Sequence, residues 1–161
     1  MKSIIRIILM PILFASCQYD PYAGNLTTKK PKIADITGTY KFQEQSVYDS
    51  PLIKSALVST ITLKSDGTFE VNNMPDLVSN RTGSRLVKDL PLVSKLGKWD
   101  MQTIGSVDND FGKAKPNWGI KLDGMPESLT YIGFMNNSPP YKLIITYDDP
   151  DLGQVMIFSK K

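Results

Sequence analysis

Histidine is absent from this chain of 161 residues, and cysteine occurs once, as Cys17. Without histidine the chain cannot use Ser-His-Asp or Cys-His catalysis, an imidazole proton shuttle or an imidazole-bound metal. A single cysteine excludes both an intrachain disulfide and a thiolate metal cluster. An enzyme would have to use carboxylates, Lys or Tyr, and no spacing of the acidic residues indicates a catalytic pair. We therefore expect no enzyme activity, no catalytic residues, no cofactor and no metal site, and a fold whose stability comes from packing alone.

The chain also has little net charge. The formal charge is +3, and Lys2 and Arg6 lie in a segment that we expect to be removed, which leaves about +1. This balance gives no electrostatic basis for binding nucleic acid. Hydrophobic residues make up 41% of the sequence, enough for one domain with a core, and the length is too small for two.

The first 16 residues predict a cleaved export signal. Lys2 and Arg6 precede an apolar stretch over residues 7–15. This stretch is shorter than the roughly 20 residues that span a bilayer, and Pro11 interrupts it. A short apolar run behind a positive flank is typical of a signal peptide.

The residues at the cleavage site indicate what becomes of Cys17. A cut after Ser16 by ordinary signal peptidase would place the bulky Phe14 where a small residue is preferred. The run Phe14-Ala15-Ser16-Cys17 instead resembles the lipobox of bacterial lipoproteins, with Phe14 where leucine is usual. The resemblance implies that Cys17 carries a diacylglycerol and usually an amide-linked acyl chain, and two or more chains attach a protein stably to a membrane. The other interpretation is a plain secretory signal with an incidental cysteine.

The residue after Cys17 bears on localisation. It is Gln18, not the aspartate associated with retention in the inner membrane. The resemblance therefore implies the cell envelope, at the outer membrane, with the face left open. Residues 17–35 contain Pro21, Gly24 and Pro31 without apolar periodicity, and we interpret them as a flexible tether that reaches roughly 20–25 Å.

From about Ile36 the pattern changes to period two. Tyr40 and Phe42 alternate with polar neighbours, and Asp66-Gly67 separates two alternating runs as a hairpin turn does. Similar runs, most of them separated by turn signals, lie near 57–63, 68–71, 99–101, 118–122, 129–135, 141–147 and 155–158. About eight short strands predict an all-β domain over 36–161, most simply an antiparallel barrel that has no exposed edges.

Several short motifs of this domain resemble a known family. Gly38-Thr39-Tyr40 resembles the Gly-x-Trp signature of lipocalins, with tyrosine in place of tryptophan. Gly97-Lys98-Trp99, the Asp66-Gly67 hairpin and the loop 149–153 before a last strand ending in Lys160 are similar to small lipocalin-like bacterial lipoproteins. Over residues 36–161 the resemblance implies an eight-stranded barrel with one open end that holds a small hydrophobic ligand.

Five aromatic residues are the candidate walls of such a cavity: Tyr40, Trp99, Trp118, Tyr141 and Tyr147. In so small a barrel the same side chains more often fill the interior as core. Both interpretations stay open at this point.

Two acidic clusters and one long segment complete the candidates. Asp148, Asp149 and Asp151 have the oxygen ligands of a divalent-cation site, but Asp, Pro and Gly are also turn residues, and we favour a turn. The run 108–112 begins like a calcium-binding EF-hand loop and lacks its glycine and glutamate spacing, so it predicts a surface turn. The segment 73–95 is compatible with a long functional loop, an irregular strand or a short helix.

Together these features predict a lipid-anchored envelope protein whose barrel binds a small hydrophobic ligand. The alternative is a protein-interaction module, such as an inhibitor, an immunity protein or a complex subunit, on a barrel scaffold. That alternative predicts an exposed apolar patch around residues 73–95. A protein partner is not identified by the sequence.

Overall fold

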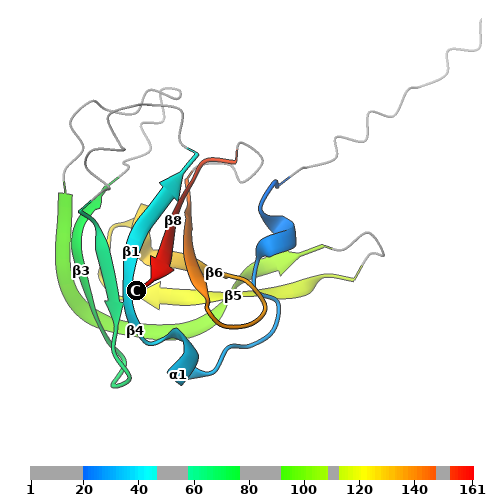
Figure 1. Ribbon diagram of the computed structural model, residues 1–161, viewed down its shortest axis with the longest axis horizontal. Coiled ribbons are helices and arrows are strands. Elements are labelled where there is room, and N and C mark those ends of the chain that lie inside the picture. Colours follow the sequence, from blue (N-terminus) through cyan, green and yellow to red (C-terminus); the bar gives the residue numbers. More distant parts are fainter. Residues whose placement is uncertain (1–19, 47–57, 77–91, 109–112, 148–152) are drawn as a thin grey trace, which may run out of the picture.

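Eight antiparallel strands form a closed barrel in which each strand pairs with the next and β8 returns to β1 (Figure 1). The computed structural model describes residues 20–46, 58–76, 92–108, 113–147 and 153–161. The strands are β1 (Gly38–Gln45), β2 (Thr60–Leu63), β3 (Thr68–Pro75), β4 (Leu92–Val107), β5 (Lys115–Leu122), β6 (Tyr131–Met135), β7 (Lys142–Thr146) and β8 (Val155–Lys160). The predicted fold class, an all-β eight-stranded antiparallel barrel, is confirmed.

The two ends of the barrel differ. We call the end where β1, β3 and β7 finish the upper end, toward which the arrow of β1 points in Figure 1, and the opposite one the lower end. Residues 47–57, 77–91 and 148–152, which follow β1, β3 and β7 in the chain, are outside the described residues. Of the segment 73–95, residues 73–75 finish β3 and residues 92–95 begin β4.

The interior follows from the alternation of side chains along each strand. In β7, Leu143 and Ile145 are fully buried inside the barrel, and Tyr147 continues their face just beyond the strand. Ile144 points to the opposite face, where it joins a second cluster with Val155 and Ile157. A strand buried on both faces explains why the run 143–145 is continuously apolar.

The lower end is closed by a short helix and by the last strand. Helix α1 (Ile33–Ile36) buries Ile36 completely, and the Tyr40 hydroxyl donates a hydrogen bond of 2.7 Å to the Ile36 carbonyl. Gly38 has a φ of 136°, and Lys160 packs so closely on it that an added Cβ would lie 2.7 Å from the lysine Cε. Lys160 Nζ then donates to the Asp35 carbonyl at 3.0 Å.

Residues 20–28 lie against the outside of the barrel, and we call them the strap. Strands β5 and β6 pair only over 119–121 and 131–133, and the strap continues the ladder where the two strands separate. Thr27 N–H donates to the Phe134 carbonyl at 3.0 Å, and Trp118 N–H donates to the Thr27 carbonyl at 2.9 Å. Its apolar side chains, Tyr22 and Leu26, pack on the outer cluster of Met135, Ile144, Val155 and Ile157.

This packing corrects the flexible tether predicted over residues 17–35, as far as that segment is described. Thr27 is fully buried, and its hydroxyl donates to the Asn136 carbonyl. This packing was not predictable from the pattern of side chains, because the strap contributes hydrogen bonds from its backbone, which do not require apolar periodicity. No helix in the described part of the chain is long and apolar enough to cross a bilayer.

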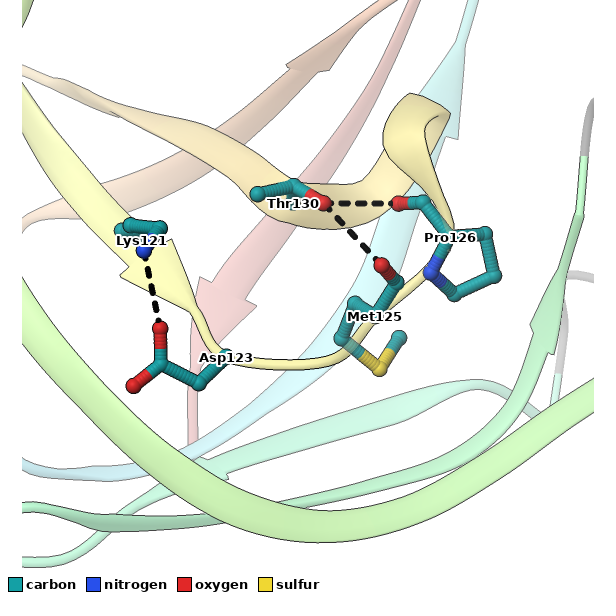
Figure 2. Close-up of polar contacts among 5 residues, drawn as sticks. All are labelled: Lys121, Asp123, Met125, Pro126 and Thr130. Carbon is teal, nitrogen blue, oxygen red and sulfur yellow. Dashed lines mark hydrogen bonds and ion pairs between the residues drawn. The ribbon is translucent and has the colours of Figure 1, made fainter.

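The connection between β5 and β6 forms a helical turn, α3 (Glu127–Thr130), where the sequence predicted a strand from 129. Figure 2 shows the Thr130 hydroxyl within hydrogen-bonding distance of two carbonyls, those of Met125 at 3.1 Å and Pro126 at 2.9 Å. A threonine hydroxyl that reaches back four or five residues holds a turn rather than a strand. Met125 and Leu129, which are both buried, thereby enter the core of the barrel.

Candidate functional site

The structure brings four of the five candidate cavity residues into one buried core. Tyr40, Trp99, Tyr141 and Tyr147 belong to it, and Trp118 packs against it while remaining partly exposed. Their polar atoms distinguish them. The question for each is whether its hydroxyl or indole N–H already has a partner in the fold.

Several of these aromatic groups are engaged at or near the lower end. The Trp99 indole N–H donates to the Lys64 carbonyl at 3.1 Å, as the Tyr40 hydroxyl does to Ile36. The Lys30 ammonium lies over the ring of Trp118, 5.2 Å from its centroid, at a distance typical of a cation–π contact. These side chains close and brace the barrel.

Tyr141 also belongs to the lower end, at the start of β7. Its ring packs at 6.2 Å between centroids on Phe134. Burial raises the pKa of its hydroxyl, and the Asp35 carboxylate raises it further. Tyr141 directly precedes β7 (Lys142–Thr146), so it lies at the end of the barrel where β7 begins.

Tyr147 lies at the upper end, and its hydroxyl differs from that of Tyr40 in having no hydrogen-bond partner in the described structure. The Tyr147 side chain is 5% exposed. Burial raises the pKa of this hydroxyl, and the charge of Asp76 raises it further. The hydroxyl therefore stays protonated and is available as a donor and an acceptor.

Gln45 is the second polar residue of this kind at the upper end. Both its amide nitrogen and its amide oxygen are buried without a partner in the described structure. Gln45 and Ile145 both pair with Met156, which lies between them in β8. Because directly paired residues share a face of the sheet, Gln45 points toward the interior, as Met156 does.

A bulge in β1 explains why Gln45 points inward. Phe42 pairs with Phe158, but Glu44 pairs with Ile157, so one extra residue is inserted in β1. The insertion reverses the alternation, and Gln45 takes the inward place that strict period two assigns to Glu44. Sequence reasoning named Tyr147 and missed Gln45 for this reason.

Asp76 is the acidic residue that we group with Gln45 and Tyr147 at the upper end. It follows β3, and its carboxylate accepts a hydrogen bond of 2.9 Å from the Ser128 hydroxyl of α3. The Thr130 contacts in Figure 2 fix α3 and thereby hold Ser128 in place. We call Gln45, Asp76 and Tyr147 the upper polar cluster. The Asp76 position had no signal in the sequence, because it depends on a contact between distant elements.

A groove of about 530 Å³ lies on the outside, between the chain before α1 and the start of the β2–β3 hairpin. Its walls include Lys30, Lys32, Trp99 and Asp100. The Trp99 indole N–H is already bonded to Lys64, and Lys30 faces Trp118. The indole N–H of Trp99 is therefore already used within the fold, in contrast to the buried polar atoms of the upper polar cluster.

The remaining candidates are less informative. Cys17 and its flank Phe14, Ala15 and Ser16 lie outside the described residues, as do Asp148, Asp149, Asp151 and most of 108–112. No group of three or more acidic or cysteine side chains that could hold a metal occurs in the described part of the chain. Leu92 and Leu96 are exposed on β4, at 48% and 69%, with Lys95 exposed between them.

Comparisons with known proteins do not assign a function to this site. The chain matches no protein-family model, no curated protein and no solved structure.

Proposed function

We propose that this chain is a lipid-anchored lipoprotein of the cell envelope, at the outer membrane, whose lipocalin-like barrel binds a small hydrophobic ligand. The anchor is the acylated Cys17, exposed by cleavage of residues 1–16. Support for the anchor comes from the positive flank, the short apolar run and the lipobox-like residues 14–17. The membrane is therefore the expected partner.

One observation carries the ligand-binding part: the buried Tyr147 hydroxyl has no partner among the described residues at the upper end of an apolar barrel. Leaving a buried polar group without a hydrogen bond costs about 1–3 kcal/mol. Such groups are rare in folded proteins, and each calls for an explanation, of which a functional role is one. A ligand that enters from this end would supply the missing partner and contact the apolar interior.

The anchor is tested by fractionation of cells that produce the full chain or its Cys17→Ala variant. We expect the full chain in the membrane fraction, with incorporation of labelled palmitate. The variant should lose the label and leave the membrane fraction. A variant that still sediments with membranes, or a full chain without label, would rule out the lipid anchor.

Ligand binding is tested separately, with protein purified from cells under conditions that preserve noncovalent complexes. Native mass spectrometry should show an adduct of small-molecule mass that organic extraction removes. Displacement of a fluorescent apolar probe such as 1-aminoanthracene provides a second measurement. A barrel that carries no adduct and binds no probe would remove the ligand-binding part and leave the anchor unaffected.

A further inference from the structure

The upper polar cluster limits the chemistry of the ligand, and this inference rests on the proposed ligand-binding barrel. Its members come from three distant elements: Gln45 from β1, Asp76 from the end of β3, and Tyr147 from the end of β7. Around them the interior is apolar, with Met74, Met125, Leu129 and Met156 all buried. A ligand at this place would meet a few polar groups beside a hydrocarbon surface, which is the usual composition of a small-molecule site.

The hydrogen-bonding capacity of the cluster is mixed. The Tyr147 hydroxyl is one donor and one acceptor, and the Gln45 amide offers donors on nitrogen and an acceptor on oxygen. All of these atoms are buried without partners in the described structure. A hydroxyl group on a ligand both donates and accepts, so it could bond with Tyr147 and Gln45 together.

The charge of the cluster disfavours an anion. The Tyr147 hydroxyl and the Gln45 amide are buried, and an ionised group without a charged partner is costly to bury. Asp76 follows β3 at the same end of the barrel, and its negative charge raises the pKa of the Tyr147 hydroxyl. A carboxylate placed beside Tyr147 would therefore be repelled by Asp76 in a poorly solvated environment. A neutral head group avoids this repulsion.

We propose that the upper end of the barrel binds the head of a neutral, hydroxyl-bearing amphiphile through Tyr147 and Gln45, with its alkyl chain among the apolar interior side chains. Asp76 acts as the specificity determinant that excludes fatty acids. Its carboxylate is held in place by the Ser128 hydroxyl.

The test compares three ligands with the same chain, decan-1-ol, decanoate and decane, by displacement of 1-aminoanthracene from the purified full chain at neutral pH. We expect decan-1-ol to bind about tenfold more tightly than either of the others, which corresponds to one additional hydrogen bond. Tyr147→Phe should reduce the advantage over decane, because Gln45 is then the remaining partner of the ligand hydroxyl. Asp76→Asn keeps an acceptor for Ser128 and should increase the affinity for decanoate relative to decan-1-ol.

Tyr141→Phe is the matched control. Tyr141 precedes β7 at its other end, and its side chain is as little exposed as that of Tyr147, at 5%, but its hydroxyl is not among the buried atoms that lack a partner. We expect this variant to keep the preference for decan-1-ol. Equal loss of preference in both variants would mean that the hydroxyl acts through the fold and would overturn the assignment of Tyr147.

Stability separates a ligand contact from a structural one. Because the Tyr147 hydroxyl has no partner in the described structure, Tyr147→Phe should leave the melting temperature of the ligand-free protein unchanged or raise it. A clear decrease would show that the hydroxyl is already used within the protein, by a side chain or an ordered water, and would overturn the proposal.

The remaining outcomes are also decisive. If decanoate binds as tightly as decan-1-ol, or Tyr147→Phe keeps the full preference, the head-group assignment fails while the ligand-binding barrel stands. If none of the three compounds displaces the probe although the probe binds, the alkyl-chain assignment fails. If the probe itself does not bind, the proposed ligand-binding function fails and this inference fails with it.

Discussion

Gly38 shows how one residue without a side chain determines the closed end of the barrel. Its φ of 136° is strained for any residue with a Cβ, and its surface is covered by the Lys160 side chain. That close contact allows the Lys160 ammonium to reach the Asp35 carbonyl. The same short stretch places Tyr40, whose hydroxyl bonds to Ile36. The glycine thus permits several contacts among α1, β1 and β8.

We expect Gly38→Ala to lower the free energy of unfolding by about 1–3 kcal/mol, because the substitution forces a left-handed backbone on a residue with a Cβ. Urea unfolding of the two proteins measures the change. Gly24→Ala is the control, since an added Cβ there would meet nothing within 4 Å, and it should change the stability by less than about 0.5 kcal/mol. Equal effects in the two variants would contradict the role of Gly38.

The pKa of the Asp66 carboxyl group depends on its hydrogen bonds with Thr68. Its carboxylate accepts hydrogen bonds from the Thr68 hydroxyl at 2.6 Å and the Thr68 N–H at 2.9 Å. These bonds favour the charged form and lower the pKa of Asp66 below its ordinary value of 3.8. The contribution to stability is therefore fully present above that value, and it is lost as the pH falls through the lower folded pKa.

We expect an NMR titration of the Asp66 carboxyl carbon to give a pKa below that of a model aspartate. Thr68→Val removes the hydroxyl, the largest cause of the shift, and should move the pKa upward while leaving the backbone hydrogen bond. An unchanged pKa in the variant would show that the hairpin backbone alone sets the acidity of Asp66.

Among the strands and helices, the sequence predicted those that follow from alternating apolar and polar side chains and from tight turns. Asp66-Gly67 connects β2 and β3, and the run from Trp118 to Leu122 is part of β5. The sequence did not predict α1, the inward position of Gln45 or the pairing of Thr27. Helix α1 is a single turn closed by the local bond from the Thr37 N–H to the Ile33 carbonyl, too short to show a helical period. The other two features depend on a bulge and on a backbone hydrogen bond between distant segments, and neither leaves a periodic pattern of side chains.

The candidate site was predictable only in part for the same reason. Tyr147 lies in an alternating run, so its inward position follows from Leu143 and Ile145. The missing partner of its hydroxyl does not follow from any local pattern. It depends on which residues of β1, β3 and α3 meet at the upper end, and that is determined by the closure of the whole barrel.

The pairing of the strap with β5 and β6 can be tested by hydrogen exchange. If residues 20–28 pair with β5 and β6 in solution, the Thr27 amide should be protected from hydrogen exchange because it donates to the Phe134 carbonyl. We expect protection of about hundredfold or more over an unstructured peptide, comparable to that of the amides within β6. Exchange of Thr27 at the unstructured rate would restore the flexible tether that the sequence predicted.

At the scale of the whole molecule, the strap determines how an anchored barrel would face the membrane. Pro21 lies beside Gly153 at the upper end, so close that a Cβ on Gly153 would be 2.9 Å from the proline Cγ. From there the strap runs down the outside of the barrel to Met135 near the lower end. Two residues lie between Cys17 and Asp20, the first described position, and the three steps from one Cα to the next reach at most about 11 Å. An acylated Cys17 would therefore hold the upper end near the bilayer, where an amphiphile could enter directly.

This orientation is measurable with two fluorescent labels on the acylated protein in vesicles that contain spin-labelled lipids. Val58→Cys places a label on an exposed residue at the upper end, and Ser65→Cys places one on the exposed β2–β3 turn at the lower end. We expect the lipids to quench the label at 58 more strongly than the label at 65, because a strap fixed to β5 and β6 prevents the barrel from turning over. Equal quenching would indicate a barrel that rotates freely about its anchor. Stronger quenching at 65 would place the lower end at the membrane, and ligand would then have to reach the upper polar cluster through water.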